Sequence, residues 1–202
     1  MINEEQKEAE PQKRKTATQA AASISRMSRE FITRTLQART EGKQKIAYTF
    51  IVCHHEEIFR AMDVLPIWTE QYAGVCGAKR DAERFLQRAE LLGLSRSLCT
   101  YALCGIGFEQ WREELGEMPP NSPWGGQTRP DFMISSGQII CDPRSKWYQA
   151  SQQFMPDVPI YNIDLPYPLF QRDRDHREVR GYYHKYIVKQ LRGLVTFLEQ
   201  QT

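Results

Sequence analysis

Apolar residues follow two different spacings along the chain, and each spacing predicts one kind of secondary structure. Apolar positions that recur every three or four residues favour amphipathic helices, whereas nearly continuous apolar runs favour strands covered on both faces. Helices are expected at residues 27–38, 56–62, 79–92, 98–115, 145–154 and from 183 to the end of the chain. Strands are expected at residues 45–52, 65–68, 132–134 and 159–163.

The order of these segments predicts an α/β domain with a mainly parallel sheet and flanking helices, because helices and strands alternate along the chain. An N-terminal helix and a polar arm precede this domain. Ser97 is expected to cap the helix at 98–115. The predicted divisions are a disordered or frayed arm at 1–24, the α/β domain at 25–180 and a long terminal helix at 181–202.

Composition narrows the class of protein without naming a function. The chain has 202 residues, a formal net charge of +2 and 41% hydrophobic residues, values that are ordinary for one globular domain. A charge so close to zero gives no reason to propose a nucleic-acid partner. No apolar run approaches the roughly 18 residues of a membrane span, and the first residues lack a secretory-signal pattern. We therefore expect a cytoplasmic location and reduced cysteines.

Several reactive side chains follow the predicted strands. Ligands in open α/β sheets gather beyond the carboxyl ends of strands. Cys53, His54 and His55 follow the first strand, and Cys141 follows the third. Adjacent residues cannot both point into one site. The two histidines therefore offer either one substrate contact, with His54 as the candidate, or only surface and capping roles.

Two cysteines are predicted at the starts of helices. Pro143 disfavours helical angles at Asp142, which places Cys141 on a turn before the next helix, and Cys99 is expected in the first turn of its own helix. Free N–H groups and the helix dipole stabilise a thiolate or an anionic cluster there. Cys104 lies further along the helix and benefits less. The cysteine spacing matches neither a ferredoxin run nor a zinc ribbon, so small buried core residues are the alternative interpretation.

Several segments, taken in order, resemble the benzoyl-CoA reductase and 2-hydroxyacyl-CoA dehydratase family, in particular its D-component type of subunit. The resemblance covers about residues 28–200. The segments that carry it are Glu57-Ile58-Phe59-Arg60-Ala61, Leu98-Cys99-Thr100-Tyr101 with Gly105-Ile106-Gly107, Asp131-Phe132-Met133-Ile134, Cys141-Asp142 with Lys146-Trp147, Val158 to Pro166, and Tyr186 to Leu191.

This resemblance implies a fold, a cofactor and partners. Family subunits have two Rossmann-like or flavodoxin-like halves, pair as heterodimers and hold a [4Fe–4S] cluster through three cysteines. Two of those cysteines match Cys99 and Cys141, and the third is expected from a second half outside this chain, with Cys104 or Cys53 as substitutes. An ATP-dependent activator iron–sulfur protein supplies one electron, which passes to an acyl-CoA thioester and forms a radical. Dehydratases then expel water, and reductases dearomatise a benzoyl ring.

Three hypotheses follow from the sequence. The first is the iron–sulfur N-terminal half of such an enzyme, with a lean toward the reductase branch from the Cys99-Thr100-Tyr101 and Val188-Lys189-Gln190-Leu191 segments. The second is an α/β interaction subunit of the same fold that has lost the cluster. The third and weakest is a structural zinc domain.

Overall fold

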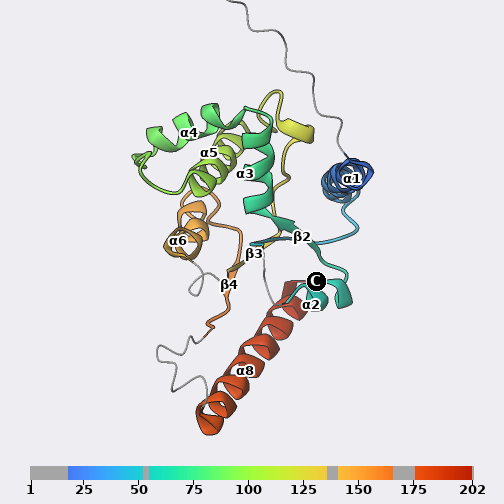
Figure 1. Cartoon of the computed structure of the whole chain (residues 1–202), viewed down its shortest axis with the longest axis vertical. Coiled ribbons are helices and arrows are strands. Elements are labelled where there is room, and N and C mark those ends of the chain that lie inside the picture. The colour runs from blue at the N-terminus through green and yellow to red at the C-terminus, as the bar shows by residue number, and fades with distance from the viewer. Residues whose placement is uncertain (1–17, 52–54, 136–140, 166–175, 202) are drawn as a thin grey trace, which may run out of the picture.

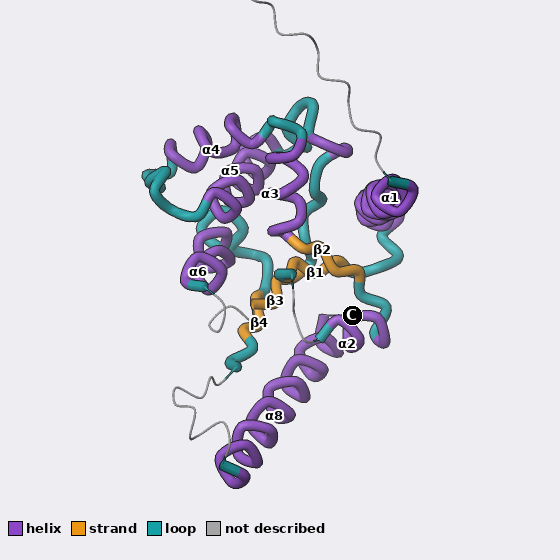
Figure 2. The backbone as a smooth tube through the Cα atoms, in the orientation of Figure 1, coloured by secondary structure: helices purple, strands orange, loops and turns teal. Residues whose placement is uncertain are grey.

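Four parallel strands form the sheet at the centre of the molecule (Figures 1 and 2). The computed structural model describes residues 18–51, 55–135, 141–165 and 176–201. The strands lie in the order β2-β1-β3-β4, and each neighbouring pair is parallel, which confirms the predicted α/β class. Their bounds are β1 Ile46–Thr49, β2 Leu65–Trp68, β3 Phe132–Ser135 and β4 Ile160–Asn162.

The helices match the predicted segments with one addition. Their bounds are α1 Gln19–Glu41, α2 Glu56–Ala61, α3 Thr69–Ala78, α4 Ala82–Leu91, α5 Thr100–Leu115, α6 Asp142–Ser151 and α8 Arg177–Gln201, with a 3-10 turn η1 at Pro123–Gly125. The spacing of apolar residues does not predict α3. Its buried side includes the polar Thr69, and its outward side carries the small residues Gly74, Gly77 and Ala78, so it lacks the amphipathic spacing that marks the others.

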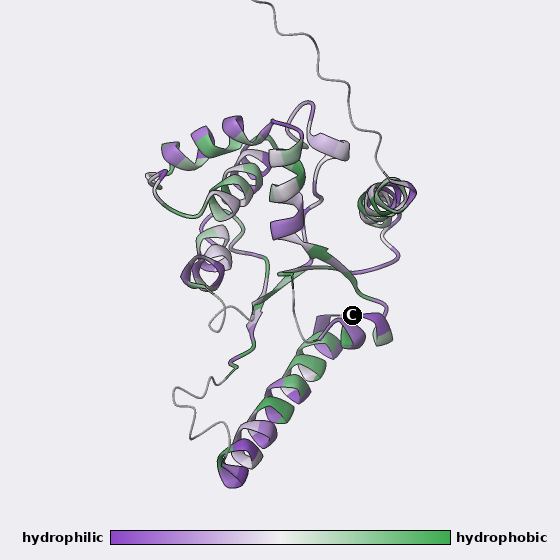
Figure 3. Ribbon diagram, in the orientation of Figure 1, coloured by the Kyte–Doolittle hydropathy of each residue, from purple (hydrophilic) through white to green (hydrophobic). Residues whose placement is uncertain are grey.

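Helices cover both faces of the sheet. Figure 1 places α3, α5 and α6 on one side, and α2 and α8 on the other. The side chains of β1 alternate accordingly, because successive residues of a strand point to opposite faces. Tyr48 and Phe50 pack with Trp147 and Tyr148 in one core cluster, whereas Ala47 belongs to the second cluster. The central strands β1 and β3 are buried along their whole length, whereas the edge strand β4 is partly exposed. Burial on both faces explains the apolar runs of the central strands, and Figure 3 shows the hydrophobic colour concentrated in the sheet.

The first and last helices begin earlier than predicted. Thr18 caps α1 by accepting a hydrogen bond from the Ala21 N–H at 3.2 Å, so residues 19–24, which were assigned to the polar arm, are helical. The alanines at 20–22 favour this extension. Gly42 ends α1 in the left-handed conformation, with a φ of 65°. The last helix begins at Arg177 instead of residue 181. No helix in the described ranges is both long and apolar enough to cross a membrane.

The outer edge of the sheet at β2 carries a proline. The Leu65 N–H donates to the Lys45 carbonyl next to β1 at 2.9 Å. Backbone groups of a strand alternate in direction, so the nitrogen of Pro66 faces away from β1, where a strand hydrogen bond is not needed. The proline therefore fits this edge without disturbing the ladder.

Helices α4 and α5 touch backbone to backbone at Gly107. A Cβ added there would lie 1.9 Å from the Phe85 carbonyl oxygen, and no side-chain rotation relieves that contact. We expect Gly107→Ala to lower the unfolding free energy by about 2 to 3 kcal/mol, measured by urea denaturation. Gly77→Ala is the matched control, because nothing lies within 4 Å of its added Cβ. It should stabilise by up to about 1 kcal/mol. Equal effects of the two substitutions would contradict the close helix contact.

Candidate functional site

Helices α3 and α6 meet over the carboxyl end of β1. Thr69, which begins α3, has its hydroxyl 3.5 Å from the Thr49 carbonyl and 3.2 Å from the Tyr148 hydroxyl of α6. Arg144, also on α6, donates to the Ile51 carbonyl just beyond the strand. The chain runs from β1 out to β2 and then back past β1 to β3, so this end of β1 is the switch point of the sheet, where α/β proteins bind ligands.

Cys99 and Cys141 each occupy the N-cap position of a helix. Cys99 precedes α5 and is partly buried, whereas Cys141 precedes α6 and is exposed. The predicted location at helix starts is confirmed, with two corrections. The cap of α5 is Cys99 and not Ser97, and α6 begins at Asp142, three residues earlier than predicted. Asp142 is therefore helical, contrary to the expectation that Pro143 keeps it out of the helix, and Pro143 lies in the first turn, where proline is well tolerated.

Contacts between α5 and α6 show that the two helices run parallel. A Cβ added at Gly105 would lie 1.8 Å from the Trp147 ring. One turn further on, the Ser151 hydroxyl donates to Glu109 at 2.5 Å. Both pairs join residues that are 42 positions apart in the sequence, and both positions advance toward the carboxyl ends of their helices.

The same register brings the two cysteines to the same end of the helix pair. Cys99 and Cys141 are also 42 positions apart, and each lies six residues before a member of the Gly105–Trp147 contact. The N-termini of α5 and α6, each with a cysteine at its cap, therefore point in the same direction. Their dipoles and free N–H groups favour a thiolate or another negative group there.

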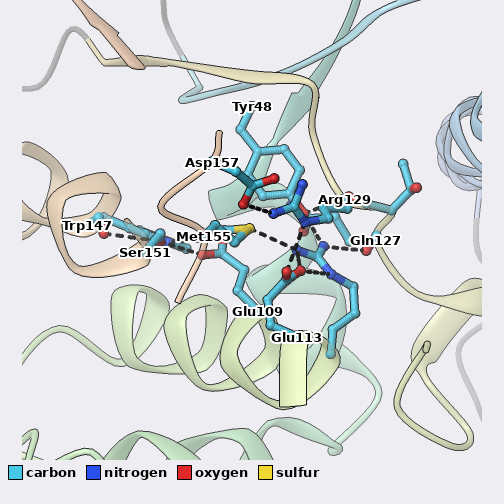
Figure 4. A network of polar contacts seen from close by, with 11 residues as sticks. Tyr48, Glu109, Glu113, Gln127, Arg129, Trp147, Ser151, Met155 and Asp157 are labelled. Carbon is cyan, nitrogen blue, oxygen red and sulfur yellow. Dashed lines mark hydrogen bonds and ion pairs between the residues drawn. The ribbon is translucent and has the colours of Figure 1, made fainter. Parts of the chain in front are cut away.

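Glu109 lies buried between α5 and α6 (Figure 4). One carboxylate oxygen accepts from the Ser151 hydroxyl, and the other accepts from the Trp147 indole N–H at 3.2 Å. Burial raises the pKa of Glu109 to about 7, although the Ser151 hydrogen bond and the Arg112 charge act in the opposite direction. The side chain therefore changes protonation near neutral pH.

Arg112 links α5 to the centre of the sheet. Its guanidinium is buried, and one nitrogen donates to the Tyr48 hydroxyl at 2.6 Å and to the Gln127 carbonyl at 3.0 Å. The other terminal nitrogen lies 2.8 Å from a Glu113 carboxylate oxygen and 3.2 Å from the Met155 sulfur. This cation is well paired, as a buried charge must be to avoid a large desolvation cost.

Cys104 faces the core instead of the cysteine pair. It is buried, and its thiol and that of Cys76 on α3 are within hydrogen-bond reach. That contact and burial raise the pKa of the Cys104 thiol, so it stays protonated at neutral pH. Iron–sulfur ligation needs a thiolate. The structure therefore favours the core interpretation for Cys104 over a ligand role.

The histidine next to the first strand is a core residue. His55 is buried, lies 3.3 Å from the Thr49 hydroxyl and packs edge-on against Phe59. Cys53 and His54 lie outside the described residues, so the structure does not bear on their suggested roles. Within the described ranges, no group of three or more His, Cys, Asp or Glu side chains is arranged to hold a metal ion.

Sequence reasoning missed Glu109 and Arg112. Both belong to a helix that is otherwise mostly apolar, and Gly105, Glu109 and Arg112 follow the spacing of one helix face. A glycine followed by two charged residues on such a face is the signal that would have found them, because charged residues there must meet polar partners.

Comparison with known proteins identifies the family. The model of the family described as 2-hydroxyglutaryl-CoA dehydratase, D-component, matches residues 51–202. The chain belongs to this family. The matched region contains both N-cap cysteines and the whole α5–α6 pair, and it leaves out α1 and β1. The resemblance in the sequence is therefore confirmed for the dehydratase D-component.

Three relatives in this family are dehydratase alpha subunits. Lactoyl-CoA dehydratase subunit alpha from Anaerotignum propionicum is 26% identical over 68% of this chain and 32% of its own length. The (R)-phenyllactyl-CoA dehydratase alpha subunit of Clostridium sporogenes is 25% identical over 55% of the chain and 25% of its own length. The (R)-2-hydroxyisocaproyl-CoA dehydratase alpha subunit of Clostridioides difficile is 27% identical, with the same coverage. The chain thus spans about a quarter to a third of these curated relatives.

Proposed function

We propose that the chain is the cluster-binding N-terminal half of a 2-hydroxyacyl-CoA dehydratase subunit. The observation that carries the proposal is the pair of thiols at the caps of two parallel helices, Cys99 on α5 and Cys141 on α6. Membership of the D-component family supports it. The substrate is an acyl-CoA thioester, and the reaction removes water from a 2-hydroxyacyl group.

The two N-cap thiols suit a [4Fe–4S] cluster. Neither side chain makes a capping hydrogen bond to its own helix, so each sulfur is available to a ligand. Cys141 is exposed, which allows a further ligand to come from another segment or chain. When bound, the cluster supplies a single low-potential electron. Cys99 and Cys141 would hold it, and the two helix N-termini would stabilise its negative charge.

The relatives favour dehydration over ring reduction. All three are named as dehydratases of 2-hydroxyacyl-CoA thioesters, whereas the sequence segments at 99–101 and 188–191 pointed toward the benzoyl-CoA reductase branch. Their designation as alpha subunits supports a related second subunit as partner. An ATP-dependent activator that delivers the electron completes the proposed system.

Iron binding tests the proposal directly. The chain is reconstituted anaerobically with iron and sulfide in the presence of its partner subunit. It should then absorb at about 400 nm, as thiolate-bound clusters do. Cys99→Ser and Cys141→Ser should each lose most of the iron and the absorbance. Cys76→Ala is the control, because Cys76 is buried on α3.

Two further variants locate the third ligand. Retained iron in Cys53→Ala and Cys104→Ala would place that ligand outside this chain. If iron content is unchanged in both Cys99→Ser and Cys141→Ser, the proposal is wrong, and the interaction subunit without a cluster becomes the better interpretation.

A further inference from the structure

Glu109 is the main polar contact between the two helices that carry the N-cap cysteines. Its carboxylate accepts the Trp147 indole N–H at 3.2 Å and the Ser151 hydroxyl at 2.5 Å, so one side chain of α5 receives two donors from consecutive turns of α6 (Figure 4). All three residues are buried, Ser151 completely. A contact of this kind resists both sliding and rotation of α6 along α5.

The contact between Trp147 and Gly105, one turn before Glu109, also fixes the register of the two helices. The Trp147 ring lies where a Cβ of Gly105 would be, so the indole is wedged against the α5 backbone. The indole N–H of the same ring donates to Glu109, and this hydrogen bond fixes the orientation of the ring. The ring cannot turn within this slot without giving up the hydrogen bond, because a buried indole N–H needs a partner.

The helices transmit this register to their N-termini. Glu109 lies ten residues beyond Cys99, and Trp147 lies six residues beyond Cys141. A helix rises about 1.5 Å per residue, so the clamp acts on the caps over roughly 9 to 15 Å of regular helix. A slip of one residue of α6 would turn its cap by about 100° relative to α5, since a helix has 3.6 residues per turn.

We propose that Glu109 is a positioning residue that sets the spacing of the Cys99 and Cys141 thiols. The function of that spacing, to hold a cluster, rests on the function proposed above. Glu109 does not touch the thiols and acts only through Trp147 and Ser151. Its removal leaves the buried Trp147 indole N–H without its acceptor, whereas the Ser151 hydroxyl keeps the Trp147 carbonyl as an acceptor at 3.2 Å. Helix α6 then regains the freedom to shift against α5.

Thiol crosslinking measures this spacing without any metal. Dibromobimane becomes strongly fluorescent when both of its bromomethyl groups react with nearby thiols, whereas monobromobimane reports the reactivity of single thiols. The ratio of the two rates is measured in the full chain carrying Cys53→Ser, in which Cys76 and Cys104 are buried. Cys99→Ser and Cys141→Ser give the background. The register of α5 and α6 predicts that the parent chain gives a crosslinking ratio clearly above the background of these two variants.

Variants of the clamp decide the proposal. Glu109→Ala should lower the crosslinking ratio about tenfold, the factor that corresponds to one buried donor left without a partner. Glu109→Gln should restore it, because its amide oxygen accepts from Trp147 and its amide N–H donates to Ser151. Ser151→Ala removes one donor with little change in volume, and Trp147→Phe removes the other donor together with part of the ring that packs on Gly105. Both variants test the same contact if Glu109→Ala folds poorly.

Glu113→Gln is the matched control on the same helix. Glu113 pairs with Arg112 and Arg129 and not with α6, so its replacement should leave the crosslinking ratio unchanged. An unchanged ratio in Glu109→Ala, Trp147→Phe and Ser151→Ala, or no crosslinking above background in the parent chain, would overturn the positioning role. If Glu109→Ala lowers the crosslinking ratio but Cys99→Ser and Cys141→Ser leave the iron content unchanged, the positioning role is supported and cluster binding is not.

Discussion

Arg112→Met should lower the unfolding free energy by about 3 kcal/mol, the largest single loss that we expect in this protein. The guanidinium is buried and supplies donors to Tyr48, Gln127 and Glu113 at once. Methionine fills a similar volume but leaves these acceptors without their donor, and the cost of unpaired buried polar groups exceeds the value of the hydrogen bonds that they made. Urea denaturation at pH 7 measures the loss.

Arg129→Met is the matched control for this prediction. Arg129 also pairs with Glu113, at 2.8 Å, and with Asp157, at 2.6 Å, but it is more exposed than Arg112. Solvent screens such pairs, so the same substitution should cost at most about 1 kcal/mol. Similar losses in the two variants would mean that burial of the Arg112 network does not govern its contribution to stability.

Raising the pH from 5 to 8 should destabilise the protein through Glu109. Its pKa is raised by burial from the ordinary value of 4.5 to about 7, so the folded state holds this proton more tightly than the unfolded state does. The corresponding stability is fully present below pH 4.5 and is lost as the pH rises through 7. A shift of this size corresponds to roughly 3 kcal/mol. Unfolding free energies at half-unit pH intervals measure the decline.

Glu109→Gln should remove that decline, because a neutral amide imitates the protonated acid at every pH. Near pH 5 the variant and the parent should be about equally stable, and by pH 8 the variant should be the more stable. Glu113→Gln removes the same charge one turn away and should keep the decline. A parent chain whose stability is flat between pH 5 and 8 would show that Glu109 is not the titrating group that we infer.

The sequence predicts most of the fold because local signals and tertiary packing agree there. The range of β2 is predicted without error, and Gly93 follows α4 in a left-handed conformation, as a helix stop should. Helix α3 escapes prediction because Gly74, Gly77 and Ala78 occupy outward positions where charged residues usually mark a polar face. The error at residues 19–24 has the opposite cause, since a cap and three alanines stabilise a polar helix that lacks a buried face.

The candidate site is predictable only in part. The spacing of apolar residues and Pro143 locate the helix starts near Cys99 and Cys141 to within a few residues, although Asp142 is helical where Pro143 was expected to exclude it. That the two starts lie at the same end of a parallel helix pair depends on the fit of Trp147 against Gly105, and no local rule links residues so far apart in sequence. The contacts of Glu109 with Trp147 and Ser151 depend on the same packing, so they cannot be predicted from the local sequence either.

The proline in β2 makes the two borders of the sheet unequal as templates for other chains. A strand of four residues has two outward-facing backbone positions, and at β2 these are Pro66 and Trp68. Proline has no N–H, so half of the outward donors are missing along this border. An incoming strand, whether from a misfolded copy or from a growing fibril, would leave a carbonyl unpaired at every addition. Pro66 thus opposes self-association at the β2 border, where Trp68 also packs against Phe31 of α1.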